Sequence, residues 1–274
     1  MAPAQLALVT LAGFGAGVLN ALAGGGTLLS FPALVAAGLP GLIANATSTI
    51  ALCPGYLGAA LAQRADLQGQ RALTVLLLPV AAVGGLLGAV LLLHTSETRF
   101  TQVVPWLLLG ACALLGWQER VRAMLTLRQA RRVVAPAPVR APSASPTVPA
   151  EAAEAGTPAW LPVVVGLAAV YGGYFGAGMS VVLLAGLGLA CTDSLPRLNA
   201  LKQLLALGAN FTAAAWLALR ADVDWTLVAI VGASALVGGA CGGRLARRLS
   251  ARWLRRVVVS LGLVVALCYL LRQR

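Results

Sequence analysis

The chain has 274 residues, of which 59% are hydrophobic and only 10% are charged. An average soluble domain carries about 25% charged residues and about 45–50% apolar ones, so the composition excludes a water-soluble globule. The 31 glycines and 14 prolines lie within apolar stretches that have no Gly-X-Y period, which also excludes collagen and low-complexity disorder. The remaining class is an all-α polytopic membrane protein.

The formal net charge of +12 does not indicate nucleic-acid binding. The arginines lie in short stretches between apolar segments and are not interleaved with aromatic residues, and such flanking charge more often encodes membrane orientation. The five cysteines are scattered and show no CxxC spacing, so we expect neither a disulfide framework nor a metal site. The first apolar run has no positive leader, so we expect it to be retained rather than cleaved.

Eight apolar runs follow one another along the chain in two groups of four. The first group forms a predicted repeat over residues 1–118, and the second forms another over 159–274. Residues 119–158 are first rich in Arg and Glu and then in Pro, Ala and Ser, which predicts a flexible, basic cytoplasmic linker. The runs cover 4–38, 42–63, 71–93 and 100–117 in the first group, and 160–191, 197–219, 225–243 and 254–271 in the second.

The two halves repeat each other at an offset of 154 residues. A nearly constant register across a whole half indicates internal duplication, even in a composition rich in Gly and Ala. The GxxxG spacings that begin at Gly84 and Gly238 lie within uninterrupted helices and predict close helix packing. The aligned pairs include Ala23-Gly24 with Ala177-Gly178, Asn45-Ala46 with Asn199-Ala200, and Gly84-Gly85 with Gly238-Gly239.

The first run of each half is too long for a single membrane crossing. About 35 residues of helix would extend about 52 Å, whereas the hydrocarbon core is about 30 Å thick. Glycine-rich breaks at 23–27 and 176–180 instead favour two short helices in each run. Each half then has five segments, and because five is odd the second copy must insert upside down.

The distribution of arginine supports this inverted topology. With the linker in the cytoplasm, five segments per half place 15 of the 19 arginines on the cytoplasmic side, whereas four segments per half give a split of 11 to 8. Both termini are then predicted to face away from the cytoplasm.

The two glycine breaks are the first candidates for substrate binding. A helix that begins within the membrane exposes unpaired N–H groups and the positive end of its dipole, which together attract an anion. Glycine allows the anion to approach the backbone closely, and a hydroxyl adds a hydrogen-bond donor. Alternatively, the glycines serve helix packing alone. The predicted substrate-binding residues are Gly24, Gly25, Gly26 and Thr27 in the first break, and Gly176, Gly178 and Ser180 in the second.

Polar clusters open the second long run of each half, at 45–49 and 199–203. Amides and hydroxyls can replace part of the hydration shell of an anion, but they can equally bond a neighbouring helix or their own backbone. We predict substrate contacts for Asn45, Thr47, Ser48 and Asn199, with Asn20, Asn210 and Thr212 as weaker candidates.

Lys202 is the only lysine among 20 basic residues, and it aligns with neutral Ser48. An ionisable residue within a membrane segment is costly and marks a functional site, here as the counter-charge of an anionic substrate. The alternative is that Lys202 reaches cytoplasmic water or pairs with Asp193.

The sequence contains no recognisable catalytic or energising machinery. All eight carboxylates fall in predicted loops or near segment ends, so no buried proton relay is evident. The sequence shows no arrangement of nucleophile, base and orienting group, and no phosphate-binding loop. We therefore expect neither enzymatic activity nor a cofactor.

The order and duplication of these motifs resemble the TauE/SafE sulfite exporter family. The resemblance covers both halves but not the linker, whose length departs from the compact pattern of the family. It implies a multi-pass carrier in the bacterial inner membrane for sulfur-containing anions such as sulfite or sulfonates. The motifs are Gly13–Gly17, Ala23–Thr27, Phe31-Pro32 and Ala44–Thr49 in the first half, and Tyr174–Gly178 with Asn199–Lys202 in the second.

The sequence thus predicts a secondary transporter that exports a small sulfur-containing anion. An inside-negative potential drives the export of each negative charge with about 2.3 kcal/mol per 100 mV, so energetics do not require a coupling ion. The expected partners are the anion and the lipid bilayer, and a homo-oligomer is left open. The alternatives are a permease for another small anion, an uptake carrier, or a non-transporting membrane scaffold or assembly factor.

Overall fold

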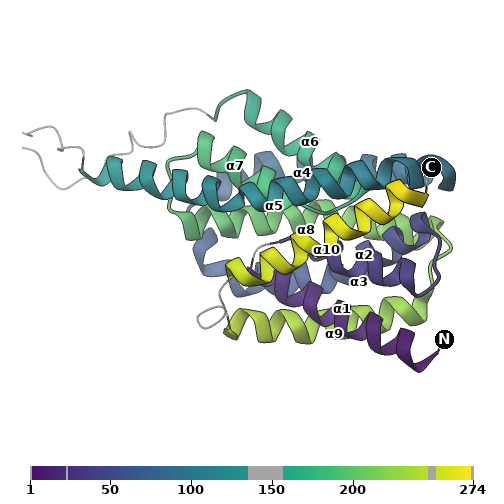
Figure 1. Cartoon of the computed structure of the whole chain (residues 1–274). Coiled ribbons are helices and arrows are strands. Elements are labelled where there is room, and N and C mark those ends of the chain that lie inside the picture. Colours follow the sequence, from purple (N-terminus) through teal and green to yellow (C-terminus); the bar gives the residue numbers. More distant parts are fainter. Residues whose placement is uncertain (1, 23, 135–156, 246–250, 273–274) are drawn as a thin grey trace, which may run out of the picture.

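The computed structural model describes residues 2–22, 24–134, 157–245 and 251–272. These residues form ten α-helices and one 3-10 turn and contain no strand, which confirms the predicted all-α fold. The helices form an elongated bundle, and α1 begins at the end of the bundle where α10 finishes (Figure 1).

Each half contributes five helices, and the first two helices of each half are separated by a predicted break. The first half contains α1 Pro3–Leu22, α2 Thr27–Ala36, α3 Gly41–Ala62, the 3-10 turn η1 Arg64–Leu67, α4 Arg71–Leu93 and α5 Glu97–Val134. The second half contains α6 Trp160–Tyr174, α7 Met179–Ala190, α8 Leu195–Arg220, α9 Trp225–Leu245 and α10 Ala251–Arg272.

By length and composition, three of the described helices are able to cross a membrane: their apolar spans are Pro3–Asn20, Arg71–Leu93 and Glu97–Arg128. The apolar helices α2 and α7 are shorter, with 10 and 12 residues. At about 1.5 Å per residue they extend only about 15 and 18 Å, so neither crosses a core of about 30 Å by itself. Each break therefore divides a membrane segment into a longer and a shorter helix.

Helix α5 corrects the predicted start of the linker. It runs without interruption to Val134, so residues 119–134 are helical rather than flexible. This stretch is rich in strong helix formers and has no Gly or Pro before Pro136, so the loss of apolar character does not end the helix. The rest of the predicted linker, at 135–156, lies outside the described residues, as do Arg247 and Arg248.

The helices pack in a pattern that is symmetric under exchange of the two halves. Helix α1 packs on α9, and its counterpart α6 packs on α4. Helix α3 also packs on α9, and its counterpart α8 also packs on α4. The contacts of α3 with α8 and of α5 with α10 join corresponding helices of the two halves. Internal duplication predicts this exchange symmetry.

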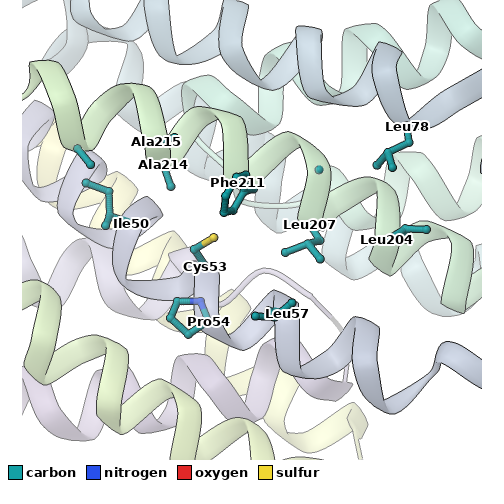
Figure 2. Close-up of a pocket in the computed structure, with 12 residues that line it drawn as sticks. Ile50, Cys53, Pro54, Leu57, Leu78, Leu204, Leu207, Phe211, Ala214 and Ala215 are labelled. Atoms are coloured by element: carbon teal, nitrogen blue, oxygen red, sulfur yellow. The ribbon is translucent and has the colours of Figure 1, made fainter. Parts of the chain in front are cut away.

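Corresponding helices α3 and α8 run antiparallel. Gln63, which directly follows α3, accepts a hydrogen bond from Asn199 near the start of α8. Ile50, nearer the start of α3, lies beside Ala214 and Ala215, nearer the end of α8 (Figure 2). An inverted repeat requires corresponding helices to run in opposite directions. The orientation of each half in the membrane stays a prediction.

Glycines bring several of these helices close together. Gly84 and Gly88 of α4 face the backbone of α6, and Gly238 of α9 faces the backbone carbonyl of Phe14 in α1. A Cβ at any of these positions would collide with the neighbouring helix. The packing role that the GxxxG spacings predict is therefore confirmed for these three glycines.

An aromatic cluster packs beside the second break. The rings of Phe31 in α2 and Phe175, the residue after α6, meet edge to face with centroids 5.6 Å apart. Phe100 of α5 packs on Phe31 at 6.3 Å. Because all three rings are fully buried, they fix the position of α2 relative to the end of α6.

Candidate substrate-binding site

The two glycine breaks lie against each other inside the protein. A Cβ on Gly24 would lie 2.8 Å from the Ser180 Oγ, and a Cβ on Gly176 would lie 3.2 Å from the Thr27 Oγ1. All four residues are buried. The first break therefore faces the start of α7, and the second faces the start of α2. We call this contact region, formed by residues 24–27 and 176–180, the break junction.

The break junction depends on glycine because the backbone enters the left-handed region. The angle φ is +79° at Gly24, +93° at Gly25, +82° at Gly176 and +89° at Gly178. A side chain with a Cβ is strained in this conformation. Gly26 and Gly178 are the N-cap residues of α2 and α7, so the breaks place both helix starts at the junction.

Asn20 of α1 caps the start of α2. The Gly26 N–H donates to the Asn20 Oδ1 at 2.8 Å. Asn20 is 6% exposed, and in the described part of the chain its Nδ2 amide has no hydrogen-bond partner. The sequence ranks Asn20 among the weaker candidates, whereas the structure places this buried donor beside the break junction. Its only sequence signal is its position shortly before the first break.

Ser48 links α3 to the same region through a residue that the sequence analysis missed. The Ser48 and Ser30 hydroxyl oxygens are 2.6 Å apart, and the Ser30 hydroxyl donates to the Gly26 carbonyl at 3.3 Å. Both serines are almost completely buried. The predicted site residue Ser48 therefore belongs to the group around the first break. Ser30 has no distinctive sequence signal, because single serines are common in membrane helices.

Asn45 connects α3 to the second break. Its Nδ2 amide donates to the Tyr174 carbonyl, at the end of α6, at 2.8 Å. Within the described residues, neither the Asn45 Oδ1 nor the Thr47 Oγ1 has a hydrogen-bond partner, and both side chains are fully buried. Unsatisfied buried polar atoms are costly in hydrocarbon, so these atoms are candidate ligand contacts.

Asn199 and Lys202 form a separate group near the start of α8. The Asn199 Nδ2 donates to the Gln63 Oε1 at 2.6 Å, and the Lys202 Nζ donates to the Asn199 Oδ1 at 2.8 Å. Asn45 and Gln63 are 18 residues apart along α3, a separation of about 27 Å. The structure therefore does not bring the two repeat-related asparagines together. Gln63 is a second polar residue that the sequence analysis missed.

Lys202 is 3% exposed, so it does not extend to the surface of the protein. Among the described residues its ammonium has one hydrogen bond and no carboxylate partner. The alternative pairing with Asp193 is wrong, because Asp193 binds Arg197 instead. The surroundings of Lys202 therefore favour an anion.

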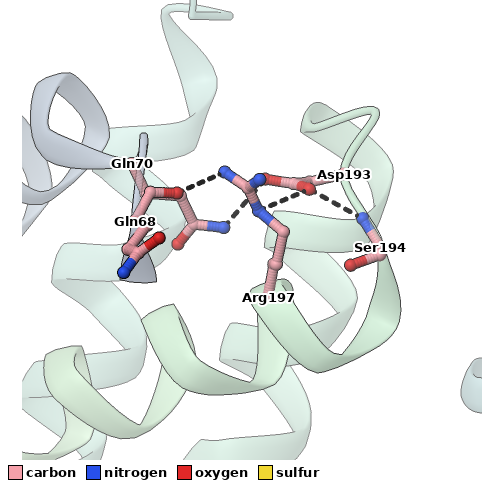
Figure 3. Close-up of polar contacts among 5 residues, drawn as sticks. All are labelled: Gln68, Gln70, Asp193, Ser194 and Arg197. Atoms are coloured by element: carbon pink, nitrogen blue, oxygen red, sulfur yellow. Dashed lines mark hydrogen bonds and ion pairs between the residues drawn. The ribbon is translucent and has the colours of Figure 1, made fainter. Parts of the chain in front are cut away.

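Figure 3 shows a polar cluster that ties the two halves together before α8. Asp193 forms an ion pair with Arg197, whose Nε lies 2.9 Å from the Asp193 Oδ1. It also accepts hydrogen bonds from the Gln70 side chain and from the Ser194 N–H, both at 2.8 Å. Arg197 also donates to the Gln68 carbonyl at 2.7 Å. The loop between α7 and α8 is thereby held to the loop before α4.

Cys191 lies in this loop, directly after α7. Burial, and next the Asp193 carboxylate, raise the pKa of the Cys191 thiol above its usual value, so the thiol stays protonated at neutral pH. No group of three or more His, Cys, Asp or Glu side chains in the described ranges is placed to hold a metal ion.

The two remaining weaker candidates make contacts that hold helices. Asn210 donates to the Ala206 carbonyl of its own helix at 2.8 Å. Thr212 of α8 donates to the Ala82 carbonyl of α4 at 2.7 Å. Such hydrogen bonds need no ligand.

The apolar helices and the symmetric packing of the two halves around the buried break junction are typical of a multi-pass helical membrane protein. The sulfite exporter TauE/SafE family matches residues 9–269. The chain therefore belongs to this family of membrane transporters, as its motifs predict. No curated protein matches the chain, and no solved structure matches it.

Proposed function

We propose that the protein is a secondary transporter that exports a small sulfur-containing anion, such as sulfite or an organosulfonate, across the bacterial inner membrane. Membership of the TauE/SafE family supports a membrane transporter. The observation that supports an anionic substrate is the environment of Lys202. Its ammonium group is 3% exposed and has no carboxylate partner among the described residues.

The electrostatics of Lys202 favour an anionic ligand. A buried charge without a counter-charge is strongly unfavourable, and intramembrane ionisable residues generally mark a substrate path. An anion beside Lys202 would compensate the ammonium while Asn199 retains its hydrogen bond. Because Lys202 contacts Asn199, which in turn contacts Gln63 at the far end of α3, we propose that Lys202 lies on the path to the break junction rather than at the junction itself.

The break junction suits the several oxygens of a sulfur oxyanion. The starts of α2 and α7 direct N–H groups and positive dipole ends towards the junction. Thr27 and Ser180 bring hydroxyls, and Asn20 brings an amide donor that has no partner among the described residues. From α3, Ser48 is linked through Ser30 to Gly26, and Asn45 donates to Tyr174 before the second break. The buried Thr47 hydroxyl, which has no partner among the described residues, would be a further substrate contact. Glycines 24, 25, 26, 176 and 178 permit close backbone approach.

Alternating access would follow from one half rocking against the other. The polar cluster around Asp193 and the Asn45 bond to Tyr174 both join the halves, so opening towards either side of the membrane would exchange or stretch such contacts. A membrane potential of 100 mV drives one charge with about 2.3 kcal/mol, equivalent to an about fifty-fold concentration ratio.

The test is anion flux from liposomes that contain the purified protein. Vesicles are loaded with sulfite, an organosulfonate, phosphate, acetate or chloride, and efflux is followed with and without an inside-negative potential. We expect efflux of sulfur-containing anions above that of protein-free vesicles, and faster efflux when the potential is applied. Flux of only the other anions would instead identify another permease. Absence of all flux would support a membrane scaffold and overturn the transport proposal.

A further inference from the structure

An apolar groove lies between α3 and α8 and is bordered by α4 (Figure 2). Its volume is about 670 Å³, within the range of about 300–1,000 Å³ that is usual for ligand pockets. The twelve lining residues include no charged side chain, and Cys53 carries their only side-chain heteroatom capable of hydrogen bonding. Leu57 is 49% exposed and Phe211 is 62% exposed, so the groove opens to the outside of the bundle.

The groove follows the line along which the two halves meet. Each of the four residues that α3 contributes aligns, at the repeat offset of 154, with a residue of α8 that also lines the groove. A ligand in the groove therefore contacts equivalent positions of both halves. The aligned pairs are Ile50 with Leu204, Cys53 with Leu207, Pro54 with Gly208, and Leu57 with Phe211.

The dimensions of the groove suit a lipid chain. Its wall on α8 extends from Leu204 to Ala218, a length of about 21 Å, whereas one leaflet of hydrocarbon is about 15 Å thick. An open, apolar groove at this depth must be filled by hydrocarbon because water there would lack hydrogen-bond partners.

Two arginines lie near one end of the groove, the end that Leu57, Leu78 and Leu204 form in Figure 2. Arg71 precedes Leu78 on α4 by two helical turns and therefore shares its face. Arg64 follows Leu57 by seven residues, just beyond α3. Both arginines are exposed, and neither forms an ion pair among the described residues.

These cations favour a lipid over a second copy of the chain. Arginines at the end of a membrane segment lie at the depth of the headgroups and attract anionic lipids. A symmetric dimer across this groove would instead place the Arg64 and Arg71 pairs of both copies at the same membrane surface, where they would repel each other.

We propose that the groove between α3 and α8 binds one acyl chain of an anionic phospholipid, whose headgroup phosphate is held by Arg64 and Arg71. The lipid bridges the two halves along the line where they meet. Its binding is therefore coupled to any motion of one half against the other. This site is distinct from the break junction and does not depend on which anion the protein transports.

The first test locates the chain by photolabelling. The full-length protein is reconstituted with a phosphatidylglycerol that carries a diazirine in its acyl chain, and labelled peptides are identified after irradiation. We expect the label to concentrate on α3 and α8. Ala215→Trp fills the groove from an exposed position and should remove most of this label, whereas Ala233→Trp, at an exposed position of α9, should not.

The second test examines the headgroup. Each arginine beside an anionic lipid contributes a factor of about five to binding. Arg64→Gln and Arg71→Gln together should therefore lower phosphatidylglycerol labelling to the level of a matched phosphatidylcholine probe. Arg99→Gln changes an exposed arginine at the start of α5 and should leave labelling unchanged. These variants are exposed, so the test remains valid if Ala215→Trp fails to fold.

Four results would overturn the proposal. One is a label spread evenly over the exposed apolar helices. The second is equal labelling of Ala215→Trp and Ala233→Trp. The third is equal labelling of the unmodified protein by the phosphatidylglycerol and phosphatidylcholine probes. The fourth is a chain dimer that Ala215→Trp dissociates while α3 and α8 acquire no lipid label, which would assign the groove to a second copy.

Discussion

The start of α3 and the start of α8 occupy the same repeat position but use their polar residues differently. Asn45 and Asn199 correspond, and each donates its amide to a residue of the other half, Asn45 to Tyr174 and Asn199 to Gln63. One turn later the correspondence ends, because Ser48 aligns with Lys202.

The neighbouring helices explain the difference. Ser48 shares a hydrogen bond of 2.6 Å with Ser30 of α2. The residue of α7 that aligns with Ser30 is Leu184, which offers no polar atom to Lys202. The polar group of the first half is thus satisfied within that half, whereas the Lys202 ammonium has no carboxylate partner among the described residues. Under the proposed function, this cation of the second half meets the anionic substrate.

The largest effect is expected from Lys202→Met, which removes the charge at similar length. A hydrogen bond to a charged group contributes about 1.5–3 kcal/mol, so anion flux in liposomes should fall by about 10-fold to 150-fold. Thermal stability in detergent should be retained or raised, because an uncompensated buried charge is removed. Ser48→Ala is the matched control and should cost about 0.5–1.5 kcal/mol of stability with a smaller effect on flux. Unchanged flux in Lys202→Met would remove Lys202 from the substrate path.

We expect the stability of the protein to depend more strongly on the first break than on the second. In Gly24→Ala the new Cβ would lie 2.8 Å from Ser180, whereas in Gly176→Ala it would lie 3.2 Å from Thr27. We expect Gly24→Ala to lower the free energy of unfolding by about 1–3 kcal/mol, and Gly176→Ala to lower it less.

Gly38→Ala is the control for backbone strain alone. Gly38 also has a left-handed φ of +104°, but nothing lies within 4 Å of the position of its Cβ. Thermal unfolding of Gly24→Ala, Gly176→Ala and Gly38→Ala therefore separates the effect of backbone strain from that of a steric clash between the new Cβ and its neighbour. If Gly38→Ala is as destabilising as Gly24→Ala, contact at the break junction contributes nothing.

The smallest expected effect on stability comes from the capping of the N-termini of α3 and α8. The Glu97 carboxylate of α5 accepts from the Gly41 N–H at 2.6 Å and from the Leu42 N–H at 3.0 Å, and so caps α3. Ser194, the N-cap of α8, makes no side-chain capping bond. Glu97→Gln should therefore lower stability by about 0.5–2 kcal/mol, whereas Ser194→Ala should change it by less than about 0.5 kcal/mol. Equal melting temperatures for the two variants would contradict this difference.

Many elements of the fold, and several residues of the candidate site, can be predicted from the sequence. The breaks, the five helices in each half and the packing role of Gly84 follow from glycine chemistry and from the repeat. The extension of α5 beyond residue 119 does not follow from apolar patterning, because charged helix formers continue a helix after the apolar run ends. Asn20 and Ser30 acquire their importance only through neighbours in other helices.

The sequence alone determined a helical membrane protein of two related halves, because composition, glycine breaks and a constant repeat offset are properties of contiguous or aligned residues. Only the tertiary structure decided which polar residues meet. In the structure, Gly24 lies against Ser180 and Asn45 donates a hydrogen bond to Tyr174, whereas Lys202 and Asn199 form a separate group. The reason is that α3 and α8 run antiparallel, so residues with equal positions in the repeat lie far apart along the helix pair.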